Sequence, residues 1–149
     1  MYLVDTNVLS LGAPGRREGA TAPADSLADW LDARSDKLFL STVTVTEIAD
    51  GIAKLRRTGG LVRADRLDDW LDVVLHLYGD RVIPFDTPAA RLAGLLMDRA
   101  RATGQAPGFA DLAIAATAGV HDLTVLTRNI RHFSPLDIPA INPFEALPD

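Results

Sequence analysis

Three acidic residues are the strongest candidates for chemistry because each stands where a short apolar run meets a helical stretch. Asp5 directly follows an apolar run at residues 2–4, Glu47 lies near the start of the helical stretch after residues 38–40, and Asp111 opens a later helical stretch. Carboxylates that converge raise one another's pKa, and a bound divalent cation removes that penalty. Oxygen ligands without His or Cys suit Mg²⁺ or Mn²⁺. Such an ion activates water and stabilises charge on phosphate, which indicates hydrolysis of a phosphate ester.

Each acid also has a purely structural interpretation. Asp5 can form an Asx-turn or cap a short helix over residues 6–11. Glu47 fits a capping box that begins at Thr44, in which its side chain bonds back to the cap backbone. Asp111 stands in the first turn of a helix, where negative charge suits the helix dipole. The metal-site hypothesis therefore depends on whether the three acids meet.

The remaining sequence predicts strands that alternate with helices. Apolar runs predict strands at residues 2–4, 38–40, 81–85 and 123–126, with a candidate fifth at 140–141. Amphipathic or small apolar stretches predict helices at residues 25–33, 44–57, 61–77, 88–103 and 111–119. The helix predicted at residues 88–103 begins with Thr87 as the expected cap and Pro88 in its first turn. This order predicts an α/β fold with a parallel sheet covered on both faces.

A parallel sheet explains how distant acids can share a site. The loops that follow the carboxyl ends of its strands meet at one edge, where ligands bind. Asp5 and Glu47 come from that edge directly, and Asp111 reaches it if its helix starts there. Residues 12–24 and 104–108 are predicted loops, and no domain boundary interrupts residues 1–149. We therefore expect a single domain with one acidic edge.

Composition excludes several other classes of function. The chain has no cysteine, and its three histidines lack ligand spacing, so thiolate or histidine zinc sites are not expected. No phosphate-binding P-loop, dinucleotide fingerprint or nucleophile elbow occurs. No membrane span or signal peptide is recognisable, so a cytoplasmic location is expected. The net charge of −5 argues at first sight against nucleic acid as a partner. If some acids hold a cation, however, that cation belongs in the local charge count.

An ordered set of motifs covers nearly the whole chain. The motifs are LVDTNVL at residues 3–9, STVTVTEI at 41–48, IPFD at 83–86, DLAIAATA at 111–118 and LTVLTRN at 123–129, followed by Phe133. This set resembles PIN-domain proteins of the VapC/FitB type. Each motif is weak alone, whereas their order and spacing together are specific.

The resemblance implies a fold, an activity and partners. It implies a three-layer α/β/α sandwich around a parallel sheet of four to five strands. It implies a metal-dependent endoribonuclease, the toxin of a type II toxin–antitoxin pair, with Mg²⁺ or Mn²⁺ held at Asp5, Glu47 and Asp111. It further implies a homodimer and a VapB-type antitoxin that blocks the site and binds operator DNA. The helical segment 44–78 is the expected dimer and antitoxin face, and loop 12–24 is an expected specificity loop.

One position departs from the family pattern. Many PIN nucleases carry a fourth acid where this chain has Asn129, which keeps an oxygen acceptor but has no charge. The departure weakens the case for a second metal ion more than for the first. Asn129 either orients a water or a ligand, or it caps the next helix.

Several other residues have predicted supporting roles. Thr6, Asn7 and Thr127 are expected to hold the Asp5 carboxylate. Asp86 is expected to start its helix rather than to bind metal. Four arginines are candidates for contact with an RNA backbone, although a solvated surface role fits each of them: Arg16, Arg17, Arg128 and Arg131. Trp30 and Trp70 have helix-face spacing and are expected in the core or at a partner interface.

Two rival functions remain open. A haloacid-dehalogenase-like phosphatase also begins with a strand that ends in Asp, but it needs a second acid at the position of Asn7. A non-catalytic interaction module on a PIN-like scaffold would explain the neutral side chain of Asn129.

Overall fold

A five-stranded, wholly parallel sheet forms the centre of the molecule. The structure is a computed structural model, and it describes residues 1–15 and 22–149. The strands are β1 (Tyr2–Val4), β2 (Leu38–Ser41), β3 (Val82–Ile83), β4 (Thr124–Leu126) and β5 (Ala140–Ile141), and they lie side by side in the order β3-β2-β1-β4-β5. The first strand is central, between β2 and β4. The candidate fifth strand is confirmed, whereas the third is shorter than predicted.

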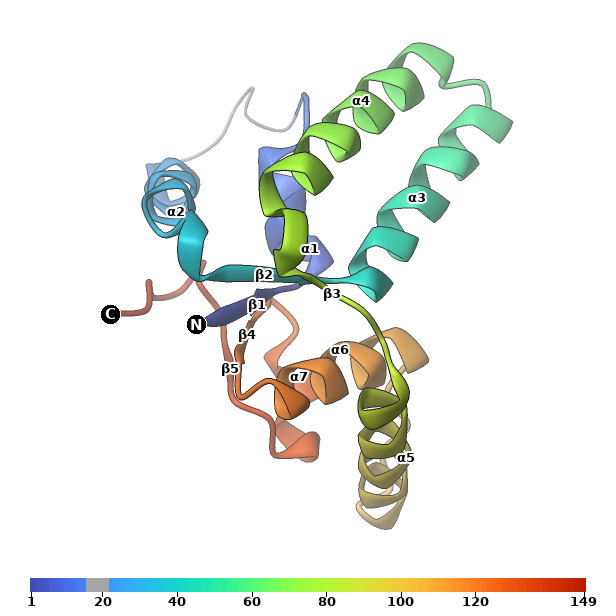
Figure 1. Cartoon of the computed structure of the whole chain (residues 1–149), viewed down its shortest axis with the longest axis vertical. Helices are drawn as coiled ribbons and strands as arrows, with labels where there is room; N and C mark the ends of the chain where they lie inside the picture. The colour runs from blue at the N-terminus through green and yellow to red at the C-terminus, as the bar shows by residue number, and fades with distance from the viewer. Residues whose placement is uncertain (16–21) are drawn as a thin grey trace.

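Helices cover both faces of this sheet (Figure 1). On one face lie α1 (Thr6–Leu9), α2 (Ala22–Ala33), α3 (Thr42–Arg57) and α4 (Leu61–Tyr78), as Figure 1 shows. On the other face lie α5 (Thr87–Ala102), α6 (Phe109–Val120) and α7 (Ile130–Phe133). The arrangement is the three-layer α/β/α sandwich that the sequence predicted. None of the described helices is long and apolar enough to cross a membrane.

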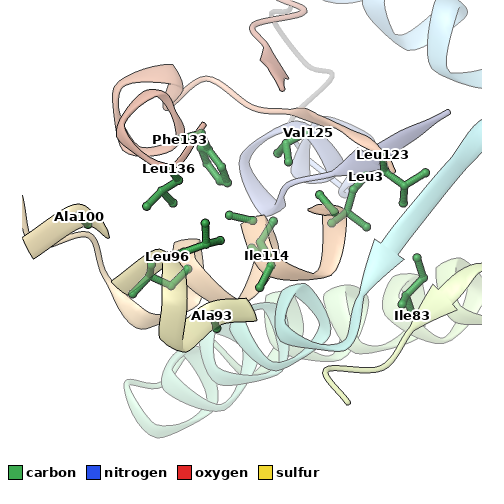
Figure 2. Close-up of a cluster of buried hydrophobic side chains, with 14 residues drawn as sticks. Leu3, Ile83, Ala93, Leu96, Ala100, Ile114, Leu123, Val125, Phe133 and Leu136 are labelled. Carbon is green, nitrogen blue, oxygen red and sulfur yellow. The ribbon is translucent and has the colours of Figure 1, made fainter. Parts of the chain in front are cut away.

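Alternate side chains of each strand enter two separate cores. Leu3 and Val125 face α5 and α6, together with Leu96, Ile114 and Phe133 (Figure 2). The intervening strand residues Val4 and Leu126 face the other side, where they pack with residues of α1, α2 and α4: Val8, Leu27, Trp30 and Val74. This alternation follows from the two-residue period of a strand, and both layers of helices are held by buried apolar surface.

The helices α3 and α4 form a hairpin with an apolar seam of its own. Ile48 and Ile52 of α3 pack against Ala64 and Leu71 of α4, and the partly buried Trp70 joins this seam to the main core. Trp30 is buried, and its ring meets Tyr2 edge-on at 5.5 Å between centroids. Both tryptophans therefore serve the core, one of the two roles that the sequence predicted for them.

Several predicted helix starts are wrong by one to three residues. Helix α3 is capped by Ser41, whose Oγ accepts the amide N–H of Val43 at 3.1 Å, and not by Thr44. Asp86 rather than Thr87 caps α5, because its carboxylate accepts the amide N–H of Ala89 at 3.1 Å. Ser41 was not among the caps predicted for α3, whereas both Asp86 and Thr87 were expected at the start of α5.

The predicted loops are confirmed only in part. Helix α2 begins at Ala22, so it takes in the end of the segment 12–24 that was expected to be a loop. Arg16 and Arg17 lie outside the described residues. The shorter loop before α6 ends at Gly108 as predicted, and α6 begins at Phe109, two residues before the predicted start of that helix.

Candidate metal and active site

Asp5 is a buried carboxylate at the carboxyl end of the central strand. Its side chain is only 4% exposed, and its backbone N–H donates to the carbonyl of Leu126 in the neighbouring strand at 3.0 Å. One carboxylate oxygen accepts the amide N–H of Thr6 at 2.7 Å. The other accepts from Asn7 Nδ2 at 2.8 Å and from Thr127 Oγ1 at 2.7 Å. The predicted supporting roles of Thr6, Asn7 and Thr127 are therefore confirmed.

Two opposing effects act on the pKa of Asp5. Burial raises its pKa above the ordinary value, and repulsion from Asp111 adds to this effect. The hydrogen bonds from Thr127, Thr6 and Asn7 act in the opposite direction. A carboxylate has about four lone-pair positions, and three protein donors leave about one open for a further electrophile. Asp5 thus caps α1 and still has room for a ligand.

Glu47 turns toward Asp5 and does not close a capping box. Its Oε1 accepts a 2.7 Å hydrogen bond from Thr6 Oγ1, so one threonine bridges the two acids through its amide and its hydroxyl. Partial burial raises the pKa of Glu47, and repulsion from Asp5 and Asp111 raises it further. Thr44, the expected partner in the capping box, lies inside α3 with its hydroxyl buried and unpaired among the described residues. The structural interpretation of Glu47 is therefore wrong.

Asp111 reaches the same edge of the sheet because α6 starts there. The helix runs back toward the amino end of β4, so its first turn stands beside the carboxyl ends of β1 and β2. Its Oδ2 lies 2.8 Å from Nδ1 of His132 in α7. Repulsion from Asp111 adds to the effects that raise the pKa of Asp5 and of Glu47.

The hydroxyl of Thr127 links Asp5 to the segment that carries Asn129. Besides its bond to Asp5, Thr127 Oγ1 accepts the amide N–H of Asn129 at 3.0 Å and that of Asn7 Nδ2 at 3.2 Å. Asn129 precedes α7, and its side chain makes no capping hydrogen bond. Asn129 therefore occupies the N-cap position of α7, as one of its two interpretations predicted, but its side-chain amide has no partner among the described residues.

The arrangement is chemically suited to a hard cation. Among the described residues, no three acidic or histidine side chains already lie close enough to form a complete metal-binding group. Mg²⁺ does not require one, because it commonly binds through one or two carboxylates and keeps several waters. Asp5 has one open lone pair, and Oδ1 of Asp111 has no partner within the described part of the chain, so these two carboxylates meet that requirement.

The other candidates lie at the margin of this edge or away from it. The guanidinium of Arg128 lies 3.7 Å from the centroid of the Phe144 ring, while its backbone N–H donates to Asn7 Oδ1 at 3.0 Å. Arg131 is exposed. Asp86 caps α5 as predicted and takes no part in the acidic cluster.

Sequence reasoning missed His132. The three histidines were set aside because their spacing fits no zinc site, and that argument considered histidine only as a metal ligand. The sequence did hold a signal that could have found it. His132 follows closely after Thr127 and Asn129, and the topology brings that segment to the acidic edge.

Comparison with known proteins identifies the family. The family model for the PIN domain matches residues 2–137. The chain belongs to the PIN-domain family. The phosphatase alternative is therefore wrong, and Asn7 supports Asp5 instead of replacing a second catalytic acid.

Curated PIN relatives match over nearly their full length. The plasmid stability protein StbB of Pseudomonas syringae pv. tomato is 39% identical over 98% of this chain and 100% of that protein. Toxin FitB of Neisseria gonorrhoeae is 35% identical, over 97% of this chain and 99% of that protein. The VapC ribonuclease Y4jK of Sinorhizobium fredii is also 35% identical, over 97% and 99% respectively.

Solved structures of PIN proteins superpose closely on this one. The crystal structure of FitAcB from Neisseria gonorrhoeae gives a TM-score of 0.82 at 33% identity, over 97% of this chain and 99% of that one. A structure of FitAB bound to an IR36 DNA fragment gives a TM-score of 0.75 at 32% identity, over 97% and 96%. These matches confirm the fold and the resemblance drawn from the motifs.

Proposed function

We propose that this PIN-domain protein is a metal-dependent endoribonuclease that acts as the VapC-type toxin of a type II toxin–antitoxin pair. What supports the proposal is that Thr6 bridges Asp5 and Glu47 at the sheet edge where α6 brings Asp111, whose repulsion raises the pKa of both acids and would be relieved by a cation. The names of the relatives, toxin FitB and a VapC ribonuclease, support the same activity.

Asp5 and Asp111 would be the principal ligands of Mg²⁺, or of Mn²⁺ in its place, and Glu47 completes the acidic site. When bound, the ion supplies a more acidic water and stabilises negative charge on the phosphate oxygens. The chain fixes Asp5 through three donors and Asp111 through His132, so both carboxylates are oriented before substrate arrives. Such partners behind a metal ligand raise metal affinity and set ligand orientation.

Glu47 and Asn129 have subsidiary roles in this proposal. The raised pKa of Glu47 suits a group that takes a proton from water near the site. Asn129 stands where many PIN nucleases carry a fourth acid, and its uncommitted amide can orient a water or a phosphate oxygen. Its neutrality favours one metal ion over two.

The proposed partners follow from the relatives and from the surface of the hairpin. A VapB-type antitoxin would cover the site and provide the only contact with operator DNA, and the toxin would be a cytoplasmic homodimer. The hairpin of α3 and α4 is the proposed face for both proteins. Four large apolar side chains of α4 are exposed on it: Leu61, Val62, Val73 and Leu77.

The decisive experiment substitutes one metal ligand at a time. We expect Asp5→Asn and Asp111→Asn each to abolish cleavage of single-stranded RNA in Mg²⁺, and EDTA to abolish cleavage by the wild type. Asp86→Asn is the matched control, because it makes the same chemical change at a helix cap where Asn serves equally well. Thermal unfolding shows whether each variant is folded. Undiminished cleavage by both site variants would exclude this assignment.

The alternative function is a non-catalytic interaction module, and the neutral Asn129 favours it. In that case isothermal titration shows no Mg²⁺ binding to the wild type, while a stable complex forms with a small partner protein. A heat of Mg²⁺ binding that disappears in Asp5→Asn would reject the alternative.

A further inference from the structure

A cavity lies directly beside the acidic edge and has no part in the function proposed so far. It has a volume of about 270 Å³ and is lined by residues 105–108, which precede α6, and by Arg131 and His132 of α7. His132 also bonds to Asp111, so a single imidazole ring separates the cavity from the proposed metal site.

The charge of the cavity is opposite to that of the acidic edge. None of its lining residues is acidic, and Arg131 has no ion pair among the described residues. A guanidinium always carries its charge and matches phosphate with paired N–H donors. A polyanion approaching three carboxylates needs a cation nearby, and Arg131 is the arginine that lines the cavity beside them.

The ring of His132 has one nitrogen left for a further partner. Its Nδ1 lies 2.8 Å from Oδ2 of Asp111, and Nε2 has no partner among the described residues. The same residue lines the cavity. A ribose 2′-hydroxyl both donates and accepts, so it can pair with an imidazole nitrogen, and DNA has no such group.

We propose that this cavity is a ribonucleotide subsite, in which Arg131 binds a backbone phosphate and Nε2 of His132 forms a hydrogen bond with the 2′-hydroxyl of the same nucleotide. The inference rests on the proposed ribonuclease function and assigns to it the means by which RNA is distinguished from DNA. His132 is then the connection between substrate and metal site, because its other nitrogen holds Asp111.

The test measures binding without cleavage. A fluorescein-labelled single-stranded RNA of twelve nucleotides and the DNA of the same sequence are titrated with the full chain in EDTA, and fluorescence anisotropy is read at several salt concentrations. The variants are Arg131→Ala and His132→Asn. The amide nitrogen of Asn takes the place of Nδ1, so the contact with Asp111 is kept while Nε2 is removed. Arg101→Ala is the control, because Arg101 is exposed beside the neighbouring cavity that shares residues 105–107.

The two substitutions have different expected signatures. Arg131→Ala weakens RNA and DNA binding alike by about tenfold, and it reduces the salt slope by about 0.7. His132→Asn leaves the salt slope unchanged and lowers the RNA-to-DNA affinity ratio by about three- to tenfold, the loss expected for one hydrogen bond. Arg101→Ala changes binding by less than about twofold.

Three results overturn the subsite. They are equal effects of Arg101→Ala and Arg131→Ala, an unchanged RNA-to-DNA ratio in His132→Asn, and no preference of the wild type for RNA over DNA. Each of these can occur while Asp5→Asn still abolishes cleavage, in which case only the subsite is lost. Cleavage that persists in Asp5→Asn and Asp111→Asn rejects the ribonuclease mechanism itself, whatever the binding data show.

Discussion

Thr127 is the most informative single residue to change, because one buried hydroxyl serves three partners. It donates to Asp5 and accepts from Asn7 and Asn129, and its side chain is fully buried. Thr127→Val replaces the hydroxyl by a methyl group of similar size and keeps the β-branched shape that suits the end of a strand. The substitution therefore removes hydrogen bonds with little change in packing volume.

The expected loss of stability can be worked from these bonds. The bond to the Asp5 carboxylate is charge-assisted, and such bonds contribute about 1.5–3 kcal/mol. The amide N–H of Asn129 loses its acceptor as well, at a cost of about 0.5–1.5 kcal/mol. Asn7 keeps its bond to Asp5 and adds little. The total is a decrease of about 2–4.5 kcal/mol in the free energy of unfolding at neutral pH.

The pH dependence identifies Asp5 as the origin of this loss. The bond from Thr127 holds the pKa of Asp5 down, so its removal raises a pKa that burial already holds above the ordinary 3.8. A folded state that binds the proton more tightly than the unfolded state loses stability as pH rises through the interval between the two pKa values. The deficit of Thr127→Val is therefore complete at neutral pH and shrinks as pH falls through the folded pKa of Asp5.

Urea denaturation at pH 7 and at mildly acidic pH measures both effects, with the slope m unchanged. Thr124→Val is the matched control, since Thr124 begins β4, the strand that directly precedes Thr127, and its hydroxyl has no partner among the described residues. A deficit in Thr127→Val no larger than that of Thr124→Val would refute the reasoning, and so would a deficit that is the same at both pH values.

Two further predictions concern the acidic edge and a helix surface. Glu47→Gln keeps an oxygen for the Thr6 hydroxyl and removes repulsion from Asp5 and Asp111. Glu47→Gln should raise the melting temperature at pH 7 by about 1–3 °C. This gain should vanish in acid, where Glu47 is protonated. A melting temperature below that of the wild type at pH 7 would contradict the prediction. Gly94→Ala adds a methyl group with no atom within 4 Å on exposed helix α5. It should stabilise the fold by about 1 kcal/mol, and calorimetry showing a loss would reveal a contact on that surface.

Much of the architecture could be predicted because its signals are local. The unbroken apolar runs of β1 and β4 indicate strands buried on both faces, and the alternation with helices leaves a parallel sheet as the consistent solution. The same topology predicts that Asp5, Glu47 and Asp111 approach one another, because the edge at which strands end is independent of side-chain detail.

The contacts that decide each role could not be predicted. Thr44 and Glu47 fit a capping box by spacing alone, and only the packing of α1 against α3 shows that Glu47 turns to Thr6 instead. His132 and Asp111 are 21 residues apart and come from different helices, so no local pattern connects them. The starts of α3 and α5 were misplaced for a related reason, since Ser, Thr and Asp all cap helices and several of them stand close together at each junction.

The central place of β1 also has a consequence for the order in which the molecule is made. Asp5 is synthesised before the residues that hold it, because its backbone is held by β4 and its carboxylate by Thr127, 122 residues later. Domains emerge from the ribosome from the amino end, and contacts between distant segments must wait for the later one. A growing chain therefore carries a poorly supported Asp5, without its partner strand, until β4 and Thr127 have been translated. The site is completed only when the last strands dock, so truncated products of synthesis have the acids but not the arrangement that orients them.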